Sequence, residues 1–219
     1  MPKTVDEFTG FGVGDIVTLS DFQTQTEFGQ PEVDFKITAA RSYRCPDDRF
    51  LLTCYILEGP NDDEQPFMLM VKEVGDAYDL FVYFLEQQGE LYKAEDGQPE
   101  CELLNLFKEE EDDLKERIEA AIVDKDGNEQ SVTWDKQNGS TFGVQYSDTD
   151  EDNGITTVAE YFTDDGEVNY GNDRCFIDWK GSQESGSIEA WYGCLVEDHE
   201  VQVYSLNEDE DPDGDDWDD

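Results

Sequence analysis

The chain has 219 residues, of which 37% are hydrophobic and 12% aromatic, and it carries 57 Asp and Glu against 14 Lys and Arg. The formal charge of −43 argues against direct binding of nucleic acid or of an anionic membrane surface, because affinity for phosphates comes mainly from Lys and Arg. Its aromatic content argues against wholesale disorder. The partners that this charge favours are a basic protein or a polycation.

Near the start, the glycine-rich residues 10–15 indicate a turn that leads into a short strand at residues 16–19. Neither GK[S/T] nor a helical pattern follows, so the turn is not a phosphate loop. Residues 20–31 are polar and indicate a loop or a ragged edge strand. Residues 33–39 alternate apolar and polar side chains, which predicts a half-buried strand.

Three apolar runs separated by turn residues follow at residues 51–57, 67–71 and 80–85. Short runs of this kind, rich in aromatic and β-branched residues, predict a meander of buried strands. No polar group in residues 51–85 is expected to serve chemistry, so the stretch is interpreted as scaffold.

One cationic patch stands out in so acidic a sequence, formed by Arg41, Arg44 and Arg49. It has two interpretations, an anion site or local pairing with neighbouring carboxylates such as Asp47 and Asp48. Local pairing is the favoured one.

Apolar residues at intervals of three and four predict a helix over residues 103–121. A rival interpretation makes residues 117–123 a strand that turns at residues 126–128 into a second strand at residues 131–134. Both hold if the helix ends near Lys115. Ahead of that point lies the acidic run Glu109, Glu110, Glu111, Asp112 and Asp113.

The second half contains further short strand patterns, at residues 141–146, 155–162, 175–179, 188–196 and 201–206. From residue 208 onward the acidic composition predicts a disordered tail that carries Trp217.

The order of strands and turns in residues 53–84 resembles the order in residues 158–192. This internal similarity predicts a mainly β (α+β) fold of two small antiparallel β modules, roll-like or barrel-like, joined by one acidic helix. The modules would span residues 1–98 and 123–206, with the helix or linker at 99–122 and the tail at 207–219. The alternative is one continuous twisted meander or sandwich of about ten strands.

The motifs GVGDIVTL, YILEG followed by MLMV, and IEAWYG followed by EVQVYSL resemble uncharacterised bacterial β-rich families. Their genes tend to lie beside phage-shock (PspA-like) membrane-stress proteins. The resemblance implies an accessory role linked to the membrane-stress response, and those families have no assigned catalytic residues to carry over.

Residues that carry chemistry are sparse. The single histidine, His199, lies among carboxylates before a strand and is interpreted as a surface residue, so neither a zinc site nor a Cys–His pair is expected. Asp148, Asp150 and Asp152 are weak calcium candidates, because the loop lacks the glycine and the bidentate glutamate of an EF-hand. Apart from these three, no metal site is predicted, and no cofactor is expected.

Five cysteines occur without a CxxC pair, and three of them (Cys54, Cys175 and Cys194) lie in apolar runs as small hydrophobic side chains. No apolar run approaches the roughly 20 residues that a membrane span requires. Together with the lack of a signal-peptide pattern, these features predict a cytoplasmic protein with no membrane insertion.

The leading hypothesis is a non-catalytic interaction protein that presents Glu109 to Asp113 and Trp217 to a partner. Two alternatives stay open. One is a mimic of nucleic acid that occupies a basic DNA-binding protein, and the other is an enzyme that acts on carbohydrate through paired carboxylates. Adaptation to high salt is a further explanation of the acidity.

Overall fold

A computed structural model describes residues 3–45, 50–60, 66–90, 117–123, 129–137, 142–145, 155–163, 173–182 and 185–205. Within these ranges the protein is mainly β, and all its strands join one antiparallel sheet. The strands are β1 (Ile16–Leu19), β2 (Val33–Arg44), β3 (Leu51–Glu58), β4 (Phe67–Val74), β5 (Ala77–Glu90), β6 (Arg117–Val123), β7 (Glu129–Lys136), β8 (Phe142–Gln145), β9 (Ile155–Phe162), β10 (Arg174–Ser182), β11 (Ser185–Val196) and β12 (Val201–Tyr204). The short helices are η1 (Val5–Glu7), α1 (Phe22–Phe28) and η2 (Asp198–Glu200).

The strands follow the order β12-β1-β2-β3-β4-β5-β11-β10-β9-β7-β6, and β8 pairs with β9 beside this path. The predicted mainly β fold is therefore confirmed. Strands of both halves pair directly, because β5 pairs with β11 and the last strand, β12, returns to β1. A single sheet thus runs through both halves of the chain.

Two predictions of local structure are wrong. Residues 117–121 belong to the strand β6 and not to a helix, since β6 forms a hairpin with β7. The rival interpretation of residues 117–123 is confirmed, whereas residues 103–116 lie outside the described part of the chain. Residues 22–28 form the helix α1, where a loop or a ragged strand was expected. Asp21 starts α1, because its carboxylate accepts hydrogen bonds from the backbone N–H and the hydroxyl of Thr24.

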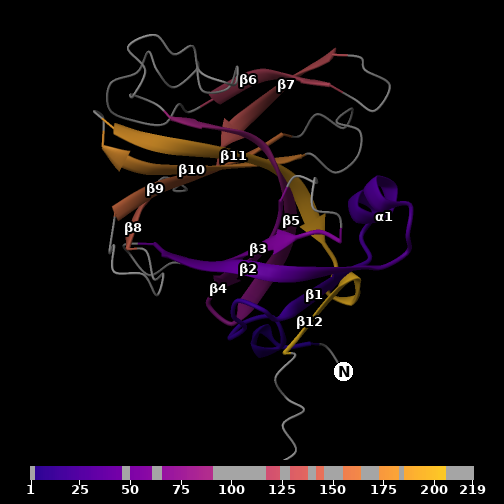
Figure 1. Ribbon diagram of the computed structural model, residues 1–219. Coiled ribbons are helices and arrows are strands. Elements are labelled where there is room, and N and C mark those ends of the chain that lie inside the picture. Colours follow the sequence, from indigo (N-terminus) through magenta and orange to yellow (C-terminus); the bar gives the residue numbers. More distant parts are fainter. Residues whose placement is uncertain are drawn as a thin grey trace, which may run out of the picture.

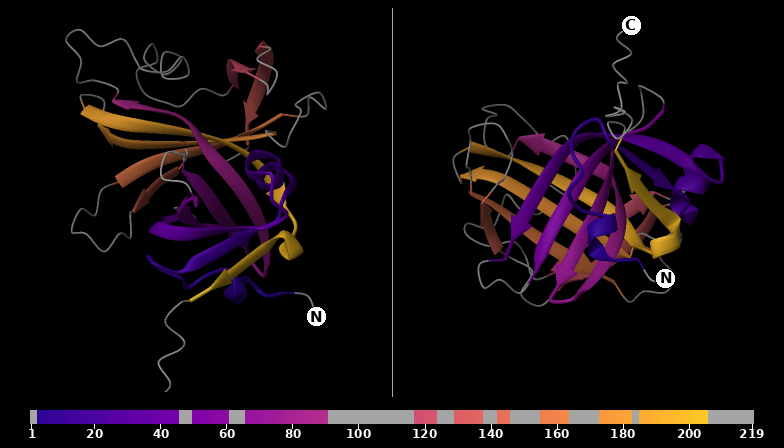
Figure 2. Two further views of the ribbon diagram at one scale, coloured as in Figure 1. Left: turned by 45° about the vertical axis from the view of Figure 1, so that its right-hand side comes forward. Right: turned by 90° about the horizontal axis from the view of Figure 1, so that it is seen from below.

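The sheet curls so that its two faces enclose separate apolar cores (Figures 1 and 2). One core lies among β1 to β5, β12 and the end of β11, and it includes Phe35, Leu69 and Val82. A second lies farther along the same face, between β9–β11 and the β6–β7 hairpin, and Phe84 packs against both cores. There Trp134 stacks on Tyr192 with ring centroids 5.0 Å apart.

The third core, called here the inner core, lies between the layer β2–β5 and the layer β9–β11, which face each other in Figure 1. Its buried apolar side chains come from both layers: Tyr43, Leu52, Cys54, Ile56, Met68, Met70, Phe81, Tyr83, Val158, Phe176 and Trp191. Side chains of sequence-distant strands therefore meet there.

A β-bulge in β2 determines which side chains point into the inner core. Ile37 pairs with Leu57 and Ala39 pairs with Ile56, so β2 holds one extra residue, Thr38. A one-residue shift exchanges the two faces of a strand. Odd-numbered residues before Thr38 point into the first core, and those after it point into the inner core.

Candidate functional site

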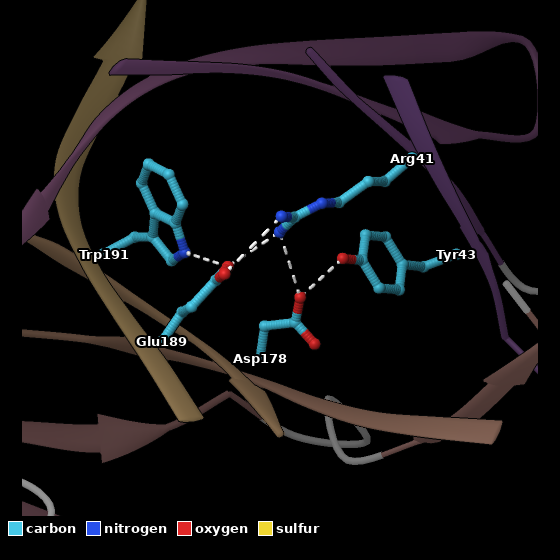
Figure 3. A network of polar contacts seen from close by, with 5 residues as sticks. All are labelled: Arg41, Tyr43, Asp178, Glu189 and Trp191. Atoms are coloured by element: carbon cyan, nitrogen blue, oxygen red, sulfur yellow. Dashed lines mark hydrogen bonds and ion pairs between the residues drawn. The ribbon is translucent and has the colours of Figure 1, made fainter. Parts of the chain in front are cut away.

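A network of polar side chains lies in the inner core (Figure 3). The Arg41 guanidinium donates from Nη1 to Glu189 Oε2 at 2.7 Å and to Asp178 Oδ2 at 3.3 Å. The hydroxyl of Tyr43 donates to the same Asp178 oxygen at 2.7 Å, and Trp191 Nε1 donates to Glu189 Oε2 at 3.3 Å. These five residues are called the Arg41 network.

Strand register explains why these groups meet. Asp178 and Glu189 are partners in the β10–β11 ladder, so their side chains lie side by side on one face of the sheet. Arg41 and Tyr43 follow the bulge in β2 and point toward them from the opposite layer. The bulge at Thr38 is therefore what brings Arg41 to the two carboxylates.

Because the charged side chains of the Arg41 network are buried, their charges have to be paired. The side chain of Asp178 is 0% exposed, those of Arg41 and Glu189 are 15% and 19% exposed, and a buried charge is costly unless it is paired. One guanidinium serves two carboxylates, and the hydroxyl of Tyr43 and the indole of Trp191 each supply a further donor.

A second polar group, called the Lys72 cluster, lies at another position in the same core. Lys72 Nζ is 2.6 Å from Glu160 Oε2, and the two side chains are 10% and 5% exposed. Lys72 Nζ also donates to Gln137 Oε1 at 3.4 Å and lies 5.0 Å above the ring of Phe50. The backbone N–H of Gln137 donates to the carbonyl of Glu160 at 2.9 Å, which fixes the glutamine beside the ion pair.

In both groups the cation and the carboxylates come from opposite layers of the inner core. The cations come from β2 and β4, whereas the carboxylates come from β9, β10 and β11. The thiol of Cys54 lies in the same core, and burial, followed by the charge of Asp178, raises its pKa well above the usual range. A thiol of this kind stays protonated and is a poor nucleophile.

The chemistry open to the Arg41 network is hydrogen bonding and ion pairing. Among the described residues, no three His, Cys, Asp or Glu side chains are grouped closely enough to hold a metal ion. An enzyme that acts on carbohydrate would use paired carboxylates beside aromatic rings. Such groups do occur together here, but one guanidinium contacts both carboxylates.

The residues that were predicted to interact with a partner or with calcium lie outside the described ranges. These are Glu109, Glu110, Glu111, Asp112, Asp113, Trp217, Asp148, Asp150 and Asp152. His199 lies exposed in η2, as expected of a surface histidine. The glycine-rich residues 10–15 form a turn in which the N–H of Gly12 donates to Asp15 and the strand β1 follows.

The structure shows partners for two cations that the sequence did not indicate. Arg41 contacts carboxylates that are 137 and 148 residues away in the sequence, beyond the local pairing that was favoured. Within the apolar stretch of residues 51–85, Lys72 is 8% exposed and pairs with Glu160. A signal for these sites exists in the sequence: Asp178 interrupts a run that is apolar on both faces of its strand, so it is buried whichever way it points.

Comparison with protein-family models, with curated proteins and with solved structures gives no match for the chain. The resemblance to bacterial membrane-stress families therefore stays a prediction. No helix in the described ranges is both long enough and apolar enough to cross a membrane.

Proposed function

We propose that the protein is a non-catalytic accessory protein whose acidic outer surface binds a basic protein. The observation that supports this function is the use of cations inside the molecule. Arg41 and Lys72 point inward and neutralise buried carboxylates, so neither contributes positive charge to the surface. With 57 Asp and Glu against 14 Lys and Arg, most of the remaining carboxylates have no cationic partner.

Other cations of the described ranges are also engaged by the chain itself. Lys3 donates to the carbonyls of Asp198 and Val201, and Arg174 pairs with Asp173. Exposed carboxylates such as Glu27, Glu32, Asp76 and Asp79 stand on the outside. A surface of this kind attracts a basic partner and repels other acidic molecules.

We also infer that β3–β5 and β9–β11 are two copies of one three-strand unit. This repeat is supported by the mirrored order β3-β4-β5-β11-β10-β9 in the sheet, with β5 and β11 antiparallel at the centre of that order. On this proposal, one copy acquired the inward cation Lys72 and the other the inward carboxylates Glu160 and Asp178.

The proposed function is tested by isolating complexes of the full chain and measuring their affinity over a range of salt concentration. We expect a basic partner at fixed stoichiometry, with an affinity that falls steeply between low and physiological salt. A Glu27→Gln/Glu32→Gln variant should bind more weakly than the matched Glu27→Asp/Glu32→Asp variant, which keeps both exposed charges. A neutral partner, or an affinity that is insensitive to salt, would contradict the proposal.

A further inference from the structure

The Lys72 cluster brings together an amine, a carboxamide and a carboxylate. Lys72 Nζ lies 3.4 Å from Gln137 Oε1, the oxygen bonded to the carboxamide carbon, and 2.6 Å from Glu160 Oε2. An amine that contacts both a carboxamide and a proton carrier is the arrangement from which acyl transfer starts.

We propose that Lys72 and Gln137 form an intramolecular isopeptide bond, with Glu160 as the residue that moves the protons. Nζ of Lys72 bonds to Cδ of Gln137, and the bond between Cδ and the amide nitrogen breaks. The product is a secondary amide between the two side chains. No oxidant, reductant or cofactor is needed.

The proton balance closes within the cluster. Glu160 first takes a proton from the Lys72 ammonium, which frees the amine to attack the carboxamide carbon. Glu160 then passes a proton to the departing nitrogen, which leaves as ammonia. That ammonia takes up the remaining proton as ammonium, and the Glu160 carboxylate is restored.

The surroundings suit this reaction. The side chains of Lys72 and Glu160 are 10% and 5% exposed, so little water competes for the amine or the carboxylate. The Phe50 ring lies 5.0 Å from Nζ and limits the directions that the amine can take. Gln137 is exposed, which gives the ammonia a route to solvent, while its backbone bond to Glu160 holds it in place.

The position of the bond explains why such a link would be useful. Lys72 lies in β4 and Gln137 follows β7, and 65 positions separate them in the sequence. A covalent bond here would join the layer β2–β5 to the β6–β7 hairpin, which pairs with β9 of the facing layer. In so acidic a chain, the bond would hold these layers together against the repulsion of their unopposed carboxylates.

The test is mass spectrometry of the purified full chain. We expect an intact mass lower than the sequence mass by one ammonia, and a digest that contains the peptides of Lys72 and Gln137 joined. Lys72→Arg and Gln137→Ala should each abolish the joined peptide. Glu160→Gln should slow or abolish its formation while both reacting residues stay in place.

Two controls make the result specific. The exposed Lys36→Arg variant should still lose ammonia, as the wild type does. The pair Asn138–Gly139 next to Gln137 can also lose ammonia by closing a succinimide, but that loss would persist in Lys72→Arg. The proposal is overturned by a wild-type mass equal to the sequence mass, by a wild type that loses no more ammonia than Lys72→Arg does, or by a digest without the joined peptides.

Discussion

Asp178 and Glu189 face each other as register partners on β10 and β11, and the single guanidinium of Arg41 contacts both carboxylates. Without Arg41, two neighbouring carboxylates would lose the cation that contacts both of them, and the hydroxyl of Tyr43 and the indole of Trp191 are neutral donors that cannot replace its charge. The stability of the inner core therefore depends on this one cation from the opposite layer.

Arg41→Met tests this dependence. Removal of one partner of a buried ion pair costs about 3 to 5 kcal/mol, because the remaining charge is left uncompensated. We expect a loss of unfolding free energy in that range, measured by urea denaturation. Arg44→Met is the matched control on the same strand. Arg44 is exposed, so its loss should cost less than about 1 kcal/mol. Equal effects of the two substitutions would mean that the network contributes nothing specific.

The sequence predicts strands well wherever apolar residues leave a local pattern, as in β9, whose predicted range of residues 155–162 matches the structure. It fails at α1, because Gln and Thr in residues 22–28 carry no apolar period and the cap formed by Asp21 depends on the fold. The direction of Arg41 depends on the bulge at Thr38. No local pattern reveals that bulge, nor a carboxylate partner on a distant strand.

Gly193 lies on β11 where the backbone of β5 is close by. A Cβ at this position would lie 2.0 Å from the carbonyl oxygen of Val82 and 2.8 Å from Cα of Tyr83. Backbone atoms cannot move aside as a flexible side chain can, so Gly193→Ala should destabilise the fold by about 3 kcal/mol or more, at the upper end of overpacking costs. The expected readout is a lower melting temperature.

Gly12 provides the control for that substitution. No atom lies within 4 Å of a Cβ built on Gly12, and the N–H that donates to Asp15 would be kept. Gly12→Ala should therefore leave the melting temperature nearly unchanged. If Gly193→Ala were tolerated as well as Gly12→Ala, the tight pairing of β5 with β11 would be wrong.

Alkaline pH should destabilise the protein through its buried thiols and phenols. Burial raises the pKa of Cys194 from 9.0 to about 12 and that of Tyr55 from 10.0 to about 12. The unfolded chain loses these protons at lower pH than the folded chain does. The contribution of the buried protonated groups to the free energy of unfolding is therefore complete below about pH 9 and is lost as the pH rises toward 12.

Melting temperatures across this alkaline range provide the measurement. Cys194→Ala should flatten the first part of the decline, above about pH 9, and Tyr55→Phe should flatten the part above about pH 10. A melting temperature that stays constant from neutral pH to about pH 11 would contradict the burial of both groups.

Salt should stabilise the fold, because 57 Asp and Glu face only 14 Lys and Arg and most surface carboxylates are therefore unopposed. The distance over which charges repel falls from about 10 Å at 0.1 M salt to about 3 Å at 1 M. We expect the melting temperature to rise with KCl over this range. Glu27→Gln/Glu32→Gln should raise the melting temperature at low salt and have little effect at 1 M, since both residues are exposed.

A rise in melting temperature that continues well beyond 1 M, where screening is nearly complete, would favour adaptation to high salt. A plateau leaves the carboxylates available for a basic partner. A flat response from the start would mean that self-repulsion is not a significant term in the stability of this sheet.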